Sequence, residues 1–309
     1  MMKALIECIQ AHRRFEIITH AWPDEDAVGS STALALGLAR LGKTVRVVYP
    51  TAAPEMLILG APPKAESAHT PEISLLVDVS DQGMLKEVRP AGMVAIIDHH
   101  RTVTDYGDIR WVEPGRSSAS EMVFELLTAM DAAIDEEIAA NLYMGIFGDT
   151  GGFTHANTSL RVFEIAGNLV RHGADPHAIA GRLKRNKPLR WYRILCLALD
   201  RLIIQDGVYA SYLTTHDFDI LGATTQDASG IVEELASLAG AELSILARDG
   251  DGDTVLCSMR SRHSPAARLT AEAFGGGGHD RAAGFTVPGR AAQLIQKIVE
   301  EGKRWVKTA

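Results

Sequence analysis

Short apolar runs alternate with helical stretches along the first half of the chain, and this alternation restricts the fold more than any other feature. The runs at 73–77 and 93–97 are apolar at nearly every position, as expected for parallel strands covered on both faces. Further strands are predicted at 15–19 and 44–49. Helical spacing predicts helices at 26–41, 118–130, 136–147, 160–171 and 176–183. The pattern predicts an α/β fold, with a doubly wound N-terminal domain on a parallel sheet.

The second half of the chain begins with a predicted helix and continues with a separate set of strands and helices. Apolar residues at helical spacing over 189–202 predict a connector helix. Beyond it, the sequence predicts strands at 207–213, 241–247 and 254–259, and helices at 228–238, 265–274 and 291–306. A length of 309 residues suits two domains. We therefore expect a first domain at 1–187, a connector helix at 188–204 and a smaller α/β domain at 205–309.

Charge and hydropathy exclude several classes of protein. The formal net charge of -8 opposes the basic surface that binding of long duplexes requires, so the expected substrate is small. No uninterrupted apolar run approaches the ~20 residues of a membrane helix, so we expect a cytoplasmic protein without a membrane partner. Cys8, Cys196 and Cys257 are odd in number and widely spaced, which predicts buried thiols instead of disulfides. The oligomeric state stays open, with a homodimer as one alternative.

Acidic and histidine residues gather directly after the predicted strands. The residues that share this placement are His20, Asp24, Asp26, Asp78, Asp98, His99 and His100. Asp149 follows a predicted helix, in a glycine-rich turn at 148–153. Because the carboxyl ends of parallel strands lie along one edge of a sheet, we expect these four segments to converge there. An isolated aspartate at a strand end is more often a helix cap, so only the joint occurrence indicates a site.

Carboxylate and imidazole groups without thiolates suit a divalent ion such as Mn²⁺, with Mg²⁺ or Co²⁺ as substitutes. Two such ions about 3.5–4 Å apart can activate water and hold the attacking and leaving oxygens of a phosphoryl displacement. The residues therefore favour phosphoester hydrolysis.

Four segments resemble the motifs of the DHH phosphoesterases, in the order that this family has them. They are His20-Ala-Trp-Pro-Asp-Glu-Asp-Ala-Val-Gly-Ser30, Asp78-Val-Ser-Asp81, Asp98-His-His100 and Gly148-Asp-Thr-Gly-Gly-Phe153. The segment 275–285 is similar to the glycine-rich signature of the DHH-associated C-terminal domain. Within the family, chain size and this second domain resemble the bacterial oligoribonucleases that degrade nano-RNA and dephosphorylate 3'-phosphoadenosine 5'-phosphate, rather than the larger RecJ exonucleases.

The resemblance implies roles for the first-domain residues. One ion would be held by His20, Asp24 and Asp78. The other would be held by Asp26, Asp78, His99 and Asp149, so that Asp78 is the bridge. Asp98 would orient a ligating histidine, and His100 would face the scissile phosphate. Glu25 departs from the glycine that relatives often carry, and it either points to solvent or alters metal affinity.

The resemblance also implies a substrate-binding role for the second domain. Arg260 and His279 would bind the nucleotide end, and Gly276, Gly277 and Gly278 would let backbone amides approach it closely. A flexible turn is the alternative interpretation of the glycine run. Arg262 and Arg281 are weaker candidates, and for both of them a solvated surface charge is the favoured interpretation.

The expected function is hydrolysis of short oligoribonucleotides, including dinucleotides, and of 3'-phosphoadenosine 5'-phosphate. The alternatives are a phosphodiesterase for linear or cyclic dinucleotides, a RecJ-like single-strand exonuclease, and a family pyrophosphatase, which the glycine-rich second domain disfavours. A catalytically silent relative that binds single strands is the alternative from another class. The filled ligand positions and the negative charge oppose it.

Overall fold

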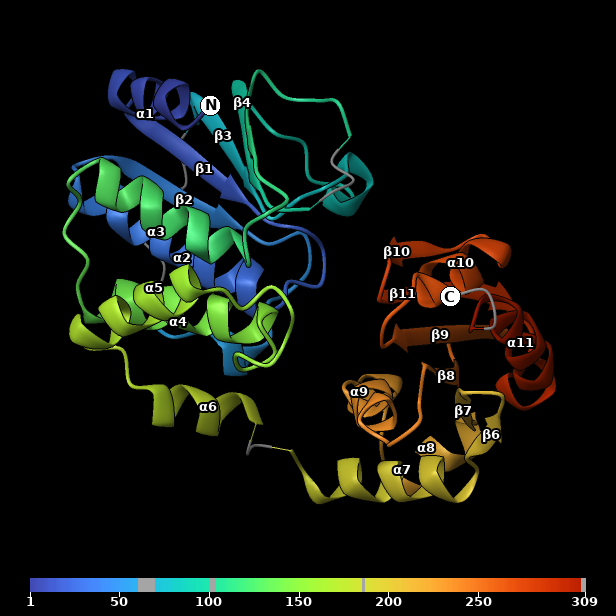
Figure 1. Cartoon of the computed structure of the whole chain (residues 1–309). Helices are drawn as coiled ribbons and strands as arrows, with labels where there is room; N and C mark the ends of the chain where they lie inside the picture. The colour runs from blue at the N-terminus through green and yellow to red at the C-terminus, as the bar shows by residue number, and fades with distance from the viewer. Residues whose placement is uncertain (61–69, 101–103, 185–186, 307–309) are drawn as a thin grey trace. The chain divides into compact units, whose positions relative to one another are not determined.

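The computed structural model describes residues 1–60, 70–100, 104–184 and 187–306, which form two compact units, Met1–Asn186 and Lys187–Ala309 (Figure 1). Each unit has its own sheet, with hydrophobic clusters packed against it. None of the described helices combines the length and the apolar character that crossing a bilayer requires. The predicted α/β fold is confirmed.

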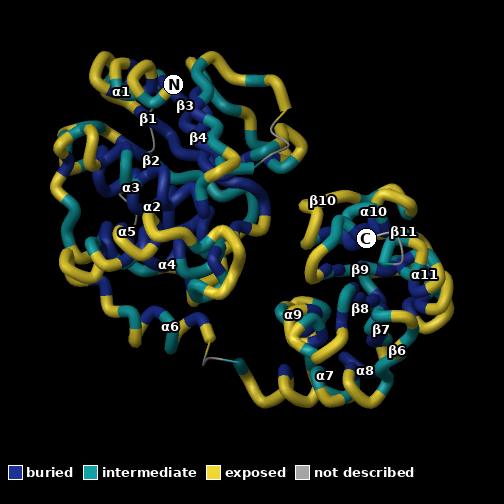
Figure 2. The backbone as a smooth tube through the Cα atoms, viewed as in Figure 1, coloured by how far each residue is buried: buried dark blue, intermediate teal, exposed yellow. Residues whose placement is uncertain are grey.

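The first unit is built on a sheet of five parallel strands in the order β2-β1-β3-β4-β5. The strands are β1 (Arg14–Ile18), β2 (Thr44–Val48), β3 (Ile73–Val77), β4 (Met93–Asp98) and β5 (Ile109–Val112). The first four were predicted from the sequence, whereas β5 was not. Figure 2 shows β3 as a buried segment, as its largely apolar sequence predicts. β1 is buried from residue 15 to residue 18, although this stretch includes Glu16.

The helices of this unit are α1 (Met2–Ala11), α2 (Glu25–Arg40), α3 (Ala119–Ala129), α4 (Glu136–Asp149), α5 (Leu160–Arg171) and α6 (Pro176–Lys184), with short 3₁₀ turns η1 (Glu55–Leu57) and η2 (Gln82–Leu85). Alternate strand residues point to opposite faces of the sheet. Phe15 and Ile17 join the large core formed with the helices, whereas Ile18 joins a smaller cluster with Leu85 of η2. The two faces of the sheet are therefore covered differently.

Helices α2 and α4 pack closely because small residues face one another. A Cβ atom on Gly29 would lie 2.4 Å from the carbonyl oxygen of Asn141, and one on Gly145 would lie 2.7 Å from Oδ1 of Asp26. No side chain fits at either position without displacing its neighbour. The crossing brings the start of α2 next to the end of α4, and both carry candidate metal ligands.

The second unit has a mixed sheet of six strands in the order β10-β11-β9-β8-β7-β6. They are β6 (Ile203–Gln205), β7 (Val208–Leu213), β8 (Leu243–Asp249), β9 (Thr254–Ser261), β10 (Gly277–His279) and β11 (Ala282–Pro288). The helices are α7 (Leu189–Asp200), α8 (Thr215–Leu221), α9 (Ile231–Ala236), α10 (Ala266–Ala273) and α11 (Ala291–Val306), with η3 (Thr225–Ala228). Strands β6, β10 and β11 and helix α8 were not predicted.

Two cores cover opposite faces of this sheet. One includes Ile245 of β8 and Ile298 of α11, and the other includes Leu246 of β8 and Trp191 of α7. Helix α7 corresponds in sequence to most of the predicted connector helix, and it packs within the second unit. The glycine run at 276–278 does not form a flexible turn: Gly277–His279 is an edge strand paired with β11.

Candidate metal centre

The carboxyl ends of three neighbouring strands carry the residues that the sequence singled out. His20 follows β1, Asp78 follows β3, and Asp98 ends β4 directly before His99. The strand order reverses between β1 and β3, which is the edge where open parallel sheets bind ligands. Asp149 is the last residue of α4, which continues beyond the predicted end at residue 147. Asp149 thus belongs to the helix and not to the glycine-rich turn.

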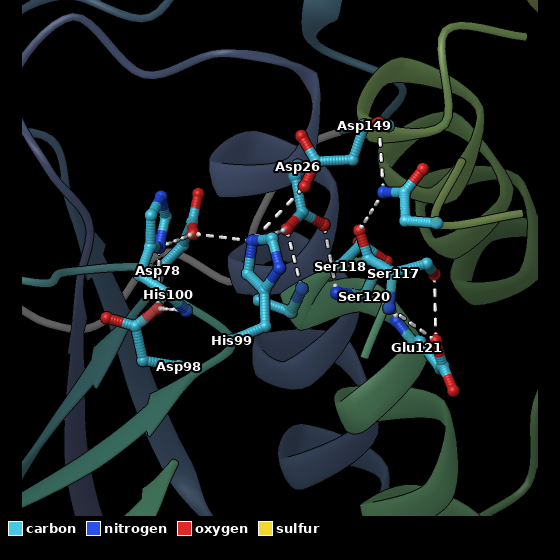
Figure 3. A network of polar contacts seen from close by, with 12 residues as sticks. Asp26, Asp78, Asp98, His99, His100, Ser117, Ser118, Ser120, Glu121 and Asp149 are labelled. Carbon is cyan, nitrogen blue, oxygen red and sulfur yellow. Dashed lines mark hydrogen bonds and ion pairs between the residues drawn. The ribbon is translucent and has the colours of Figure 1, made fainter. Parts of the chain in front are cut away.

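The side chains of these segments meet in three overlapping groups, each with its ligand atoms within 4.8 Å of one another. The groups are His20, Asp24 and Asp78; Asp26, His99 and Asp149; and Asp78, His99 and His100. Figure 3 shows Asp78 on one side of His99, with Asp26 and Asp149 on the other. The donors are imidazole nitrogens and carboxylate oxygens, a set that suits borderline to hard divalent cations.

Asp78 occupies the centre of this arrangement. One carboxylate oxygen lies 3.6 Å from Nε2 of His20, and the other lies 3.5 Å from Nε2 of His99. The residue is 2% exposed, and its Oδ1 accepts no hydrogen bond within the described part of the chain. A buried carboxylate oxygen without a hydrogen-bond donor is costly unless a cation binds it. The geometry of Asp78 therefore fits a carboxylate shared between two cations.

The first turn of α3 donates two backbone hydrogen bonds to the carboxylate of Asp26. Its Oδ2 accepts a hydrogen bond from the backbone N–H of Ala119 at 2.6 Å, and its Oδ1 accepts one from Ser120 at 2.9 Å. Nε2 of His99 lies 3.8 Å from the Asp26 carboxylate and 3.1 Å from that of Asp149. This support was not predicted from the sequence, although the serines at 117, 118 and 120 are a typical signal for a helix start.

Asp24 is both a helix cap and a member of the acidic and histidine cluster. Its Oδ1 accepts hydrogen bonds from the backbone N–H groups of Asp26 and Ala27, so it caps α2. The same oxygen lies 3.8 Å from Nε2 of His20. A helix cap and a place in the cluster are therefore compatible for this residue.

The neighbouring Glu25 does not point freely to solvent. Its side chain packs against α4, where a Cβ atom on Gly148 would lie 2.5 Å from Cβ of Glu25. Burial and the nearby carboxylates of Asp24 and Asp149 raise the pKa of Glu25. The departure from the family pattern thus adds a partly buried carboxyl group beside the cluster.

The pKa values of the clustered groups shift in both directions. Burial raises the pKa of Asp26 and of Asp149, and neighbouring carboxylates add to this. Burial also acts upward on Asp78, but the facing His20 and His99 outweigh it and lower the pKa of that carboxyl. Burial alone would lower the pKa of His20, whereas Asp24 and Asp78 raise it to about 11. The positive charge of protonated histidines thus offsets the negative charge of the carboxylates. Bound divalent cations would supply this positive charge instead, and the histidines would lose their protons.

The carboxylate of Asp98 contacts His100, the residue that follows the expected metal ligand His99. Its Oδ1 accepts the backbone N–H of His100 at 2.9 Å and lies 2.7 Å from Nδ1 of the ring. The His100 ring is also close to Asp78, with Nδ1 3.4 Å from Oδ1. Asp98 therefore orients the residue that the sequence assigns to the phosphate.

In the second unit, the predicted substrate-binding residues lie side by side across three strands. His279 pairs with Ala282, and Ala282 pairs with Arg260. Directly opposed residues share one face of a sheet, so Arg260 and His279 point to the same side. The guanidinium of Arg260 donates to Glu233 at 2.6 Å and to the carbonyl oxygen of Met259 at 2.8 Å.

Two of the glycines have a structural reason of their own. A Cβ atom on Gly276 would lie 2.3 Å from the carbonyl oxygen of Gly284, and one on Gly278 would lie 2.6 Å from that of Ala282. Gly278 also has a φ of +140°, whereas a Cβ atom on Gly277 would meet nothing within 4 Å. The close approach of β10 to β11 therefore requires glycine at 276 and 278.

Comparisons with known proteins agree with both halves of the chain. The model of the DHH family N-terminal domain matches residues 14–146, and that of the DHHA1 domain matches residues 208–308. A bifunctional oligoribonuclease and PAP phosphatase NrnA from Thermus thermophilus is 30% identical over 92% of this chain and 87% of its own. The protein of that name from Bacillus subtilis is 26% identical over 93% of each chain.

An exopolyphosphatase-related protein from Bacteroides fragilis has the same fold, with a TM-score of 0.87 at 24% identity over 99% of this chain and 95% of its own. The chain therefore belongs to the DHH family and carries a DHHA1 domain. Membership of this family makes it a hydrolase that acts on phosphate esters.

Proposed function

We propose that this hydrolase cleaves short oligoribonucleotides, including dinucleotides, and 3'-phosphoadenosine 5'-phosphate by two-metal activation of water. The proposal rests on the geometry of Asp78. One of its carboxylate oxygens lies near His20, and the other lies near His99. The names of the two NrnA relatives support the substrate class. The net charge of -8 favours short substrates, because a long strand would meet a negative surface without gaining counterion release.

The residues that would hold the cations divide into two sets around Asp78. His20 and Asp24 would bind one ion, and Asp26, His99 and Asp149 would bind the other. Mn²⁺ suits this mixture of donors, and Mg²⁺ or Co²⁺ would substitute. The bound cations would activate a water molecule and offset the charge that builds up on the phosphoryl oxygens.

The chain's own side chains position the substrate. His100, oriented by Asp98, would donate a hydrogen bond to the scissile phosphate. In the second unit, Arg260 and His279 would bind the nucleotide end. Gly277, where an added Cβ meets nothing, would admit it close to the backbone, and Gly276 and Gly278 would support this by letting β10 pack against β11. Arg260 would exchange its contact with Glu233 for the substrate phosphate, since a guanidinium binds phosphate through two parallel hydrogen bonds.

The test compares substrates by length and type. Purified protein with Mn²⁺ is assayed against RNA of two to about twenty nucleotides, a cyclic dinucleotide and 3'-phosphoadenosine 5'-phosphate; negative charge on the protein disfavours the longest strands. We expect the shortest RNAs to be cleaved fastest. Equal or faster digestion of the longest strand would favour a RecJ-like exonuclease, and a preference for the cyclic substrate would favour a cyclic dinucleotide phosphodiesterase. Binding of long single strands without any hydrolysis would indicate a silent relative.

A further inference from the structure

The loop after β1 exposes a tryptophan beside the candidate metal centre. Trp22 is 67% exposed, whereas Trp111 and Trp191 are 1% and 5% exposed. It stands two residues from both His20 and Asp24, whose side chains lie 3.8 Å apart. Covalent geometry therefore keeps its Cα within about 7.6 Å of the Cα of either residue. Exposure of an indole ring forfeits the burial that tryptophan usually gains, so packing does not explain this residue.

The backbone holds Trp22 in a conformation that bulky residues rarely adopt. Its φ is +54°, in the left-handed region, where a large side chain is a true outlier. Two contacts fix the loop: the backbone N–H of Trp22 donates to Oγ1 of Thr51 at 2.6 Å, and that of Ala21 donates to the carbonyl oxygen of Met84 at 2.8 Å. Strained residues of this kind cluster at ligand-binding sites, where the strain presets a side chain.

A cation is held against the same ring. Nζ of Lys86 lies 3.5 Å from the centroid of the Trp22 indole. Lys86 ends the turn that follows β3, it is exposed, and its φ of +51° is also in the left-handed region. The loops after β1 and β3 thus present an aromatic surface and a positive charge together, next to the edge that carries His20 and Asp78.

We propose that Trp22 and Lys86 form a nucleotide subsite of the first unit. The indole stacks on the base next to the scissile phosphate, and the ammonium group of Lys86 faces a phosphate of the same nucleotide. Stacking on an aromatic ring tolerates any base, which fits an enzyme that degrades short RNA without regard to sequence. The subsite rests on the proposed function, because it serves a substrate that carries both a base and a phosphate.

The kinetic test uses a 5'-phosphorylated adenylyl dinucleotide and an abasic analogue with the same backbone. Trp22→Ala should raise KM for the dinucleotide by roughly 5- to 100-fold, the range for loss of one stacked base, with a much smaller change in kcat. Preference for the dinucleotide over the abasic analogue should fall by a similar factor. Trp22→Phe retains a ring and should restore most of the preference. Tyr192→Ala, which removes another exposed aromatic ring, should match the wild type.

A binding measurement separates this inference from the proposed function. Rapid mixing of the Mn²⁺-loaded protein with the dinucleotide should quench tryptophan emission before turnover in the wild type, but not in Trp22→Phe. Lys86→Gln should weaken binding and lower its salt dependence, because one phosphate contact is lost, whereas Lys3→Gln should do neither.

If the wild type cleaves none of the short nucleotides, the proposed function fails, and the quenching experiment still decides the subsite. An unchanged KM for Trp22→Ala, or equal quenching in Trp22→Phe, would show that Trp22 does not touch the base.

Discussion

Asp98 and His100 are joined at two points: one carboxylate oxygen accepts the backbone N–H of His100 at 2.9 Å and lies 2.7 Å from Nδ1 of its ring. The ring orientation is therefore set by a neighbour that ends the preceding strand. A carboxylate on Nδ1 leaves Nε2 as the atom available to a substrate. Asp98 and Asp78 are both buried aspartates, yet their surroundings assign them different tasks.

This difference predicts unequal losses from two alanine variants. Asp78→Ala should abolish turnover and reduce bound metal, since Asp78 faces both sets of ligands. Asp98→Ala should retain metal and lose only about 10- to 100-fold in kcat, the range for a residue that orients another. The measurements are kcat and metal content of folded protein. Similar residual rates in the two variants would mean that Asp78 does not bridge two ions.

Removal of divalent cations should abolish hydrolysis, and Mn²⁺ should restore it at least as well as Mg²⁺. The clustered carboxylates of Asp26, Asp78 and Asp149 repel one another, so a bound cation should also stabilise the folded chain. At a concentration 100 times its Kd, a ligand that binds only the folded state adds about 2.7 kcal/mol. Calorimetry with and without Mn²⁺ measures the shift in melting temperature. Hydrolysis that survives exhaustive chelation would exclude the metal mechanism.

Arg260→Ala should lower kcat/KM on a dinucleotide by roughly 10- to 100-fold, as expected for a lost charge-assisted hydrogen bond to phosphate. Metal content should not change, because Arg260 belongs to the second unit. Arg262→Ala is the matched control: this arginine donates to the carbonyl oxygen of Leu238, and its loss should have little effect on catalysis. Parallel loss of metal in Arg260→Ala would refute the substrate-binding assignment.

Gly29→Ala should lower the melting temperature of the first unit. The new methyl group would meet the backbone oxygen of Asn141 at 2.4 Å, and overpacking of this kind costs about 1–3 kcal/mol. Gly167→Ala on α5 is the control, because nothing lies within 4 Å of its added Cβ. That variant should gain up to ~1 kcal/mol from helix propensity. Equal melting temperatures for the two variants would contradict the close helix crossing.

Asp217 predicts a stability difference that depends on pH. Burial would raise its pKa, but hydrogen bonds from Arg201 and Thr214 lower the pKa to about 2. A carboxyl with a lowered pKa stabilises the folded state above its unfolded value of about 3.9, and loses this effect as the pH falls toward 2. Asp217→Asn should therefore be less stable at pH 7 by about 1.5–3 kcal/mol, the range for loss of hydrogen bonds to a charged group.

Urea unfolding of the wild type and Asp217→Asn between pH 7 and pH 3 measures this difference in free energy. The gap should stay constant down to about pH 5 and then narrow. A gap that does not change with pH would mean that the charge of Asp217 contributes nothing and that only its shape matters.

The sequence predicted which acidic and histidine residues lie close together better than it predicted the helix and strand boundaries near them. Continuous apolar runs identified β3 and β4, and their ends located Asp78 and His99 without any knowledge of packing. The end of α4 was placed too early because Gly148 resembles a helix stop. In the structure this glycine is needed where α4 packs against Glu25, a tertiary contact that no local pattern encodes.

In the second unit, local sequence patterns also failed to predict part of the sheet. Strand β10 was missed because Gly277 and Gly278 have no side chains, so the run carries no alternation of polar and apolar residues. The strand β5 was not predicted, because its four residues include Arg110 and form a shorter and less apolar run than β4. The support of Asp26 by α3 depends on two segments about ninety residues apart in the chain, a separation beyond the reach of local patterns.

The pairing of His279 with Ala282, and of Ala282 with Arg260, makes the length of the glycine run critical in addition to its composition. Successive residues of a strand face opposite sides of the sheet, so inserting or deleting one residue ahead of His279 would turn its ring to the far side while Arg260 stayed in place. At Gly277, where an added Cβ meets nothing, the fold should tolerate a side chain. The number of residues in this edge strand thus determines on which side of the sheet the His279 ring lies.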